Sequence, residues 1–437
     1  MTGNGKRAPR GSRRLSGLLV AGLVLCAGGA AADGLERLAG KALFDKIWVS
    51  APASTRASDG LGPLYNARSC AACHAGPAHG ASLGASLGAS PDTSPDAASG
   101  LSEVVRVLHL WQPDGAGIRP DPAWGHQLQR FAAPGLHAEP DPALTHETRI
   151  MTLADGTAVP LRRPVPAALP GADPQTIVSP RIAPRLVGLG PLDRLPETVL
   201  DALADPEDVD GDGISGRRGQ ARDAAGRVVP GRFGHRAEAA TLADQIAIAF
   251  ARDIGISTPL QPAPWGDCTP AQAACRTAPH GLAAPRGAAA PRTPFELDGP
   301  GLDLVTDYTA GLRAPPGPAD PRGAALFAQL GCAACHRPTL GPAATPAFSD
   351  LLLHDMGPGL ADPGAAHLER AREWRTPPLL GLGQAARGGG VFLHDGRAGT
   401  LLEAILWHDG EAAPARDRLR ALPPEDRAAL IRYLETL

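Results

Sequence analysis

The five residues Cys-Ala-Ala-Cys-His occur twice in this chain, and no other feature constrains its fold as strongly. The first copy occupies residues 70–74 and the second occupies residues 332–336. A bare CxxC pair can serve zinc binding, thiol redox chemistry or iron–sulfur binding. A histidine directly after the second cysteine narrows the choice, because CxxCH is the attachment motif of c-type haem. The two cysteines then form thioethers to the porphyrin edge, and the histidine reaches the iron from one face.

The other uses of CxxC fit these two copies poorly. A structural zinc site needs four clustered ligands, and no second Cys/His pair lies at a suitable spacing beside either copy. A thioredoxin-like motif needs a strand-to-helix turn in a βαβ setting, which neither copy has. We therefore predict two covalently bound c-type haems. The predicted attachment cysteines are Cys70, Cys73, Cys332 and Cys335, and the predicted proximal ligands are His74 and His336.

The first 32 residues are typical of a signal peptide. A basic segment over residues 6–14 precedes the apolar run LSGLLVAGLVLCAGGA, and small residues lead up to Ala32 and Asp33. The apolar run is shorter than the roughly 20 residues that span a bilayer comfortably, although an uncleaved anchor is the alternative. We predict cleavage after residue 32 and a periplasmic protein.

Seven cysteines are present. Cys26 lies in the signal segment and four belong to the CxxCH copies, which leaves Cys268 and Cys275 in DCTPAQAAC. In an oxidising compartment we expect this pair to form a disulfide, with two free thiols or a metal clip as the alternatives. The loop that it closes is short, so the stabilisation should be on the order of 2–3 kcal/mol at most.

Composition limits the size and the partners of the protein. A chain of 437 residues with 43% hydrophobic content can form two or three domains with cores of their own. Only 4% of residues are aromatic, while Gly (53) and Pro (46) are abundant, which favours irregular structure. The net charge of −3 gives no basic surface for nucleic acid.

Two stretches open alike and predict a repeated unit. Residues 40–44 and 323–327 both follow the pattern Gly-x-x-Leu-Phe, and each is expected to begin a small cytochrome c-like unit with a helix. LPPEDRAALIRYLETL, residues 422–437, predicts a closing helix for the second unit.

The segment between the two haem motifs is expected to be a long insertion. It contains a polar loop over residues 74–100, a hairpin around Asp155 and Gly156, and a helix from Thr241. The predicted fold is mostly α with irregular loops and a few short strands. It comprises two cytochrome c-like haem domains, over residues 33–300 and 301–437, with the insertion assigned to the first.

An acidic loop lies in this insertion. Asp208, Asp210 and Asp212 alternate, and Gly213 follows, which resembles the first half of a Ca²⁺-binding loop. The bidentate glutamate expected at the twelfth position is replaced by Gly219. A calcium site and a solvated acidic turn are both open interpretations.

Several stretches together resemble the di-haem oxidoreductase family, a peroxidase group related to bacterial di-haem cytochrome c peroxidases and to MauG-type enzymes. They include GPLYNARSCAACH, SPRIAPRLVGLGPLDRLPETVL, GRFGHRAEAATLADQIAIAFARDIGI and FLHDGRAGTLLEAILWHDGEA. The resemblance extends over nearly the whole mature chain.

This resemblance implies a division of labour between the haems. The C-terminal haem would be closed by two protein ligands and exchange electrons, while the N-terminal haem would bind hydrogen peroxide or a similar small oxidant. The electrons would come from a small redox protein or a quinol-linked donor. Members of the wider group pair into homodimers, so a homodimer is also implied.

The resemblance also implies individual site residues. His408 falls where relatives supply the distal ligand of the C-terminal haem, and Met356 in HDMG is the rival, whose sulfur would raise the haem potential. Gln245 would hold the oxidant and Asp253 would move a proton between its oxygens. The alternatives are a packed core methionine, a structural histidine and a solvated helix acid.

The chain departs from the family pattern after GRFG. The family carries Trp-Lys there, whereas this chain has His235 and Arg236. In the relatives an aromatic side chain between the haems helps electron transfer, so its absence puts efficient transfer between the haems in doubt. His79, His109 and His126 are candidate distal ligands of the first haem, and an open site is preferred. The two functions to distinguish are therefore a peroxidase-like enzyme and a non-catalytic electron carrier. A thiol reductase is disfavoured, because haem attachment would consume the CxxC sulfurs.

Overall fold

The computed structural model describes residues 1–3, 34–55, 57–75, 106–115, 117–282 and 293–437. The predicted signal peptide, most of the polar loop over residues 74–100, and His79 lie outside these residues. Within the described part of the chain, no helix is both long and apolar enough to cross a membrane.

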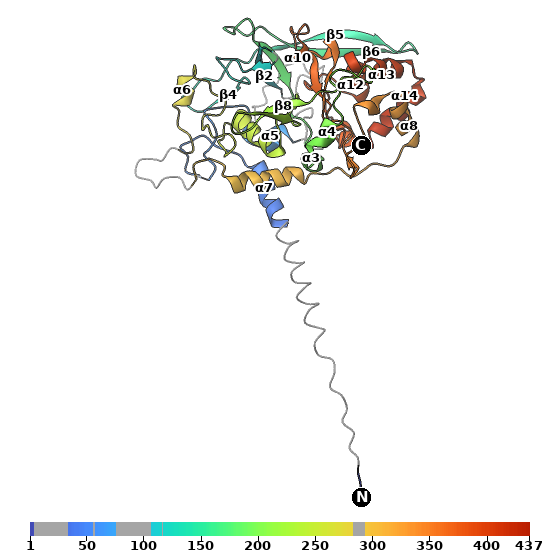
Figure 1. Ribbon diagram of the computed structural model, residues 1–437. Helices are drawn as coiled ribbons and strands as arrows, with labels where there is room; N and C mark the ends of the chain where they lie inside the picture. The colour runs from blue at the N-terminus through green and yellow to red at the C-terminus, as the bar shows by residue number, and fades with distance from the viewer. Residues whose placement is uncertain (4–33, 56, 76–105, 116, 283–292) are drawn as a thin grey trace.

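The strands form small antiparallel sheets rather than one large sheet (Figure 1). The central strand β2 pairs with β3 and β7, and the other strands pair two by two. The pairs are β1 (Leu64–Tyr65) with β4 (Phe131–Ala132); β2 (Val107–Asp114) with β3 (Gly117–Arg119) and β7 (Ile177–Arg181); β5 (Leu144–Thr152) with β6 (Ala158–Pro166); β8 (Gly219–Arg222) with β9 (Val228–Gly231); β10 (Thr339–Leu340) with β11 (Thr345–Pro346); and β12 (Leu353–Asp355) with β13 (Glu373–Arg375).

The helices are mostly short. The first described one spans residues 34–45. The others are α2 (Cys70–Cys73), α3 (Leu189–Asp193), α4 (Glu197–Asp201), α5 (Leu242–Ala249), α6 (Ala273–Arg276), α7 (Gly299–Ala310), α8 (Pro321–Gln329), α9 (Gly357–Leu360), α10 (Glu369–Arg372), α11 (Leu382–Arg387), α12 (Leu401–Trp407), α13 (Ala413–Ala421) and α14 (Pro424–Leu434), with a π-helical turn η3 (Phe250–Ile254) and 3-10 turns η4 (Cys332–Ala334) and η5 (Gly410–Ala412).

The fold is therefore mixed, and the prediction of a mostly α chain with irregular loops and a few short strands is confirmed in part: helices and small sheets are both present. Several strands are only two or three residues long, too short to show an alternating pattern in the sequence. The predicted hairpin is confirmed: β5 and β6 pair from Leu144 with Pro166 to Thr152 with Ala158, and Gly156 takes the positive φ (85°) that the turn needs. The predicted helix from Thr241 and the closing helix are confirmed as α5 and α14.

Two helix crossings in the structure are built alike. Gly323 in α8 lies against α14, because a Cβ there would meet Tyr433 Cβ at 2.3 Å and Ala429 O at 2.4 Å. Gly40 lies against α7 in the same way, since a Cβ there would meet Leu304 O at 2.1 Å and Tyr308 Cβ at 2.8 Å. Only glycine permits backbones to approach so closely.

The aromatic contacts repeat as well. The ring centroids of Phe327 and Tyr433 lie 5.6 Å apart, and those of Phe44 and Tyr308 lie 5.3 Å apart. The phenylalanine of each Gly-x-x-Leu-Phe pattern thus meets a tyrosine of the crossing helix. Helix α7 therefore packs on the first unit in the same way as α14 packs on the second. The sequence prediction, in contrast, assigns residue 301 onward to the C-terminal domain. The domain boundaries stay a prediction.

Each unit has its own apolar core. The first core joins Phe44, Trp48 and Phe250 to residues of α7, and Cys70 packs against it. The second joins Phe327 of α8 to residues of α12 and α14, and Cys332 packs against it. In Figure 1, α8, α13 and α14 lie on one side of the molecule and α5, α6 and α7 lie toward the other. The two CxxCH motifs are thus held by separate cores.

Candidate functional site

The histidine of the second CxxCH motif lies close to a second histidine. The rings of His336 and His408 have centroids 6.5 Å apart and planes inclined by 52°. His336 follows η4 and donates Nδ1–H to Phe348 O (3.0 Å), while His408 caps the C-terminus of α12 and donates Nδ1–H to Ala404 O (2.8 Å). A carbonyl at Nδ1 fixes the tautomer, so both Nε2 atoms keep a lone pair for a metal.

The spacing of this pair fits one metal ion between the rings. Two metal–nitrogen bonds of about 2 Å each, plus the distance from each nitrogen to its ring centre, span about 6 Å. Burial lowers the pKa of His336 to about 4 and also lowers the pKa of His408, so both imidazoles are neutral at physiological pH, as metal ligands must be. The structure thus places His408, predicted from the family resemblance, opposite His336.

The rival ligand Met356 lies at the start of α9. It is partly buried against the second core, and its backbone N–H binds Arg372 O. This packing matches the alternative of a core methionine, and the role of either residue as an iron ligand stays a prediction.

The first CxxCH motif forms the short helix α2. The Ser69 hydroxyl accepts the backbone N–H of Ala72 (3.2 Å) and thereby caps this helix. The backbone N–H of His74 binds Cys70 O (3.0 Å), just as that of His336 binds Cys332 O (3.0 Å). The His74 ring lies 6.3 Å from the ring of Phe44, centroid to centroid. Both motifs therefore share this backbone hydrogen bond from the histidine to the first cysteine, although the first motif is α-helical and the second is a 3-10 turn.

The four motif cysteines are free thiols in the structure, not disulfides. Burial raises the pKa of Cys70 and of Cys73 to about 12 and that of Cys332 to about 11. All four nevertheless keep part of their accessible surface, as do His74 and His336. They therefore face room that the chain's own side chains leave unfilled. Deep but accessible cysteines and histidines are what covalent haem attachment requires.

Asp253, a predicted catalytic residue, lies beside the first motif. It belongs to the π-helical turn η3, and its backbone carbonyl accepts the N–H groups of Asn66 (2.8 Å) and Ala67 (2.9 Å). Burial raises the pKa of its carboxyl to about 6. The carboxyl in turn raises the pKa of Cys70 and of Cys73, which shows that it is close to both sulfurs.

Two glutamines hold this turn in place. Gln127 Nε2 donates to Asp253 Oδ1 (2.7 Å) and to Arg252 O (3.0 Å), and Gln129 Nε2 donates to Arg252 O as well (2.9 Å). π-Helical turns leave carbonyls without regular partners and are frequent at functional sites. Neither glutamine was predicted. Their alternation in HQLQR is the one signal that could have placed both on the same face.

Gln245, the other predicted catalytic residue, lies at the opposite end of the same helix. Eight residues separate it from Asp253, which is about 12 Å of helical rise, so the structure does not bring the two side chains together. Gln245 is partly buried and its Oε1 lies near Gly234, where an added Cβ would meet it at 3.1 Å. It therefore borders the segment that carries His235.

His235 and Arg236 have different surroundings. His235 donates Nε2–H to Ile182 O (3.0 Å), and burial lowers its pKa well below its usual value. Arg236 pairs with the buried carboxylate of Asp362 (2.5 Å) and stacks over Trp374 at 4.5 Å. Trp374 in turn stacks on His394 with ring centroids 3.7 Å apart. An aromatic side chain thus lies beside this segment, although the family tryptophan is absent from it.

The two described candidates for the distal ligand of the first haem are not equivalent. His126 is partly exposed and its Nδ1 lies 2.7 Å from Asp267 Oδ1. His109 lies in β2 opposite Ser179, and burial lowers its pKa well below the usual value. A ligand role for either stays a prediction.

A third histidine lies beside the second motif, and the sequence did not indicate it. His354 Nε2 lies 2.9 Å from Asp350 Oδ2, and His354 Nδ1 lies 2.8 Å from Glu411 Oε2 and 3.9 Å from Cys335 Sγ. Burial favours the neutral ring, but these three partners raise the pKa of His354 to about 12. Both ring nitrogens have a carboxylate oxygen within hydrogen-bond distance, which favours the doubly protonated imidazolium.

The acidic loop differs from the prediction in one residue. The carboxylates of Asp205, Asp208 and Asp210 have oxygens within 4.8 Å of one another. Asp212 instead accepts the backbone N–H of Ile214 (2.8 Å). The structure thus groups Asp205 with two of the three predicted residues.

The pair Cys268 and Cys275 forms the predicted disulfide, with Cα atoms 6.3 Å apart. Both cysteines are buried beside Leu64 and Trp265. This prediction is confirmed.

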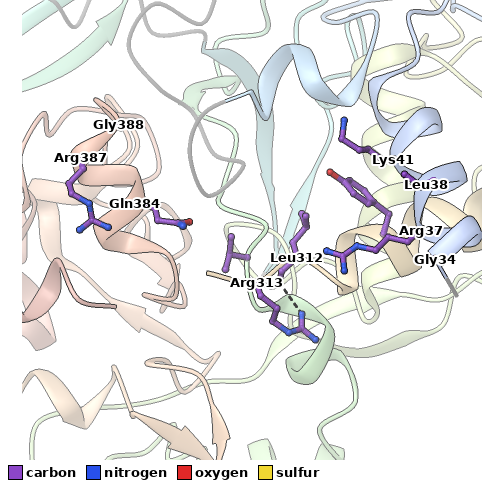
Figure 2. A pocket seen from close by; sticks show the side chains of 11 residues that line it. Gly34, Arg37, Leu38, Lys41, Leu312, Arg313, Gln384, Arg387 and Gly388 are labelled. Atoms are coloured by element: carbon purple, nitrogen blue, oxygen red, sulfur yellow. Dashed lines mark hydrogen bonds between the residues drawn. The ribbon is translucent and has the colours of Figure 1, made fainter. Parts of the chain in front are cut away.

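A cleft of about 860 Å³ opens between the segment 34–45, α7 and α11 (Figure 2). Four cationic side chains line it: Arg37, Lys41, Arg313 and Arg387. Its described lining includes no carboxylate, and Tyr308, which contacts Phe44, forms part of its wall. The cleft contains none of the predicted site residues, but it borders both units.

The fold and the site define a chain with two CxxCH motifs, each held by a similar pair of crossing helices. A family model described as "Di-haem oxidoreductase, putative peroxidase" matches residues 172–437. Because this range is more than half of the chain, the protein belongs to that family. The range includes the second motif, Gln245, Asp253 and His408, whereas the first motif precedes it. No curated protein and no solved structure matches the chain.

Proposed function

We propose that this protein is an exported di-haem c-type cytochrome oxidoreductase that reduces hydrogen peroxide or a similar small oxidant. The four motif cysteines would hold the haems as thioethers, with His74 and His336 as proximal ligands. A bound haem with an open axial position can bind peroxide and deliver electrons to it. The overall reaction takes two electrons and two protons and converts H₂O₂ into two molecules of water.

The observation that carries this proposal is the environment of Asp253. Its carboxyl is buried beside the first motif and has a pKa raised to about 6, so it can take up and release a proton near neutral pH. Gln127 binds its Oδ1 (2.7 Å), which leaves Oδ2 to exchange the proton. A group of this kind at the N-terminal centre suits proton transfer to a bound oxidant.

The second centre favours electron transfer instead. With His336 and His408 on opposite sides of one metal ion, no axial position would be left for a substrate. Electrons would therefore enter at the C-terminal haem and pass to the N-terminal haem. The cationic lining of the cleft in Figure 2 suits a donor with an acidic surface, whether a small redox protein or a quinol-linked one.

Export, calcium binding and a homodimer are further parts of the proposal. The basic and apolar segment at the N-terminus supports export to the periplasm, where a disulfide persists. The grouped carboxylates of Asp205, Asp208 and Asp210 offer oxygen ligands of the kind that Ca²⁺ prefers. Family kinship supports a homodimer.

A non-catalytic electron carrier is the second candidate, and the closed pair of His336 and His408 favours it as much as the enzyme. The test is an optical and EPR spectrum of the purified haem-loaded protein, fully oxidised and half-reduced, before and after addition of hydrogen peroxide. A high-spin signal from one haem that peroxide consumes supports the enzyme. Two low-spin haems that are indifferent to peroxide in both states would overturn it and leave the carrier.

A further inference from the structure

Two arginines, Arg185 and Arg375, form no ion pair within the described part of the chain, and each belongs to a segment that packs beside one of the two units. Arg185 precedes Leu186, which packs against the first core together with Cys70. Arg375 ends β13, and Leu353 of β12 lies opposite it. The segment from Arg375 to Pro378 brings them together, because Arg185 Nη2 donates to Pro378 O (3.1 Å).

Arg375 reaches toward both units. Its Nε donates to Gly234 O (2.7 Å), next to Gln245, and its Nη1 donates to Thr376 O (3.3 Å). The same Thr376 carbonyl accepts the Ser349 hydroxyl (2.7 Å). Ser349 directly follows Phe348, whose carbonyl orients the His336 ring. Contacts through Thr376 and Ser349 therefore link the Arg375 guanidinium to the segment that orients His336. A contact with Gly234 links it to the neighbourhood of Gln245.

Neither guanidinium forms an ion pair within the described chain. Both donate to the backbone carbonyls named above, and Arg185 Nε is buried without any acceptor. Burial lowers the pKa of both to about 10; the charge of Asp350 opposes this shift at Arg375 and the charge of Arg185 adds to it. The Asp350 carboxylate itself binds His354 (2.9 Å). Both side chains nevertheless keep part of their accessible surface, so they face room that protein does not fill.

Other buried arginines of this chain form ion pairs with buried carboxylates, which Arg185 and Arg375 do not. Arg181 and Arg236 share the carboxylate of Asp362, at 3.2 Å and 2.5 Å. Arg397 pairs with Asp395 at 2.8 Å. Burying a charge is costly unless it is paired, and two like charges close together add to that cost. The described chain gives Arg185 and Arg375 no ion pair of this kind, so an anion bound beside them would offset the cost of their burial.

We propose that Arg185 and Arg375 bind the propionate carboxylates of the haems. This inference rests on the proposed covalent di-haem site. CxxC attachment fixes one edge of a porphyrin, and the propionates extend from the opposite edge as paired carboxylates. Guanidinium groups bind carboxylates through two parallel hydrogen bonds and keep their charge even when buried. The haem at Cys70 and the haem at Cys332 can each supply such a carboxylate.

We call the proposed contact of Arg185 and Arg375 with the propionates the arginine clamp. This clamp would change the reduction potential of a haem. A fixed positive charge beside a haem favours the form that carries one more electron, so both arginines raise the reduction potential of the haem that they bind. A guanidinium also stabilises the ionised propionate and lowers its pKa. The two arginines would therefore raise the reduction potential of the haem that they bind. They would also lower the pH above which this potential no longer changes, because that pH follows the propionate pKa.

The test uses the haem-loaded protein and four variants: Arg185→Gln and Arg375→Gln, and Arg185→Lys and Arg375→Lys, which retain the charge. Arg222→Gln is the control, because Arg222 is exposed and binds only Gly226 O within the described chain. Haem content and covalent attachment are measured first by mass spectrometry. Spectroelectrochemical titrations from pH 5 to pH 9 then give the potential of each haem.

Each glutamine variant should lower the potential of one haem, with a roughly tenfold change in its reduced-to-oxidised ratio, or about 59 mV for a one-electron couple. The pH at which that potential stops changing should rise by about one unit. The lysine variants should restore most of both shifts, and Arg222→Gln should cause neither. The haem whose potential moves is the one whose propionate is bound.

The outcomes separate the two levels of the inference. If both haems are attached and neither potential nor its pH dependence moves in the glutamine variants, the clamp is wrong and the di-haem site stands. If no haem is attached to the wild-type chain, the proposed di-haem site fails and the clamp fails with it. A potential that shifts equally in the lysine variants would also reject the clamp, because loss of packing rather than loss of charge would then be the cause.

Discussion

The rings of His336 and His408 face each other with their centroids 6.5 Å apart, although the two residues belong to different elements. Each ring uses its Nδ1 proton on a backbone carbonyl. Each neutral imidazole therefore keeps an Nε2 lone pair available to a metal ion, and the centroid distance is suitable for one ion between the rings.

Replacing His408 by alanine should open the second centre. The C-terminal haem should change from a low-spin, six-coordinate spectrum to a high-spin one and should gain the ability to bind carbon monoxide. The change is read from optical and EPR spectra of the oxidised protein and from the spectrum after reduction under carbon monoxide. Met356→Leu serves as the control and should leave the low-spin signal intact. Loss of that signal in Met356→Leu but not in His408→Ala would instead identify the sulfur as the ligand.

Replacing Asp253 by asparagine should impair peroxide reduction while sparing haem attachment. The amide keeps an oxygen for Gln127 but cannot exchange a proton, so kcat should fall by about 10²- to 10⁴-fold, the usual contribution of a general acid–base group. In the wild type, accepting a proton requires the ionised carboxylate, so kcat/KM should rise with pH through about 6. The variant should lack this rise. An unchanged profile in Asp253→Asn would exclude Asp253 as the proton-transfer group.

The same carboxyl should also affect stability. Its pKa is raised from 3.8 to about 6 in the folded protein, so the folded state binds more protons than the unfolded state between these values. The free energy of unfolding should therefore fall as pH rises from about 4 to about 6. Asp253→Asn removes this fall, by at most about 3 kcal/mol for two pKa units. Thermal or denaturant unfolding at pH 4 and pH 7 measures the difference, and Asp303→Asn, a change at an exposed carboxyl of α7, is the control.

The sequence predicted the parts of the site that depend on local pattern. The CxxCH spacing identified both motifs, and the pattern Gly-x-x-Leu-Phe identified both opening helices. The disulfide followed from counting cysteines. Each of these features is set by residues close in the chain, which is why the sequence alone was sufficient.

The parts of the site that depend on tertiary contacts were not predictable. Gln127 and Asp253 meet only because β-like residues 127–129 pass beside the π-helical turn. Arg185 and Arg375 meet through a carbonyl of a segment distant in sequence. The fold class was predicted only in part for a related reason, since two-residue strands form by pairing with other segments and have no alternating pattern of their own.

Replacing His354 by glutamine should destabilise the second unit. The wild-type imidazolium lies between Asp350 and Glu411, at 2.9 Å and 2.8 Å, and its removal leaves two carboxylates buried without a cation. Breaking a buried pair in this way costs about 3–5 kcal/mol. Denaturant unfolding of the haem-loaded protein at pH 6 gives the value.

The pH dependence of this loss has a definite sign. The pKa of His354 is raised from 6.5 to about 12, so its stabilisation is complete below about pH 6.5 and declines as pH rises toward 12. The difference between wild type and His354→Gln should therefore shrink as pH rises above that value. A difference that stays constant from pH 6 to pH 9 would show that His354 is neutral in the folded protein.

Cysteine replacements should separate haem attachment from structural cross-linking. Cys335→Ser removes one predicted thioether, and Cys332→Ser with Cys335→Ser should leave a protein that carries a single covalent haem by mass spectrometry under denaturing conditions. The double variant Cys268→Ser and Cys275→Ser is the matched control, because it removes the same two sulfurs from the disulfide instead. It should keep both haems and lose about 2–3 kcal/mol of unfolding free energy, as expected for a short closed loop. Two covalent haems in the Cys332→Ser and Cys335→Ser variant would rule out thioether attachment at the second motif.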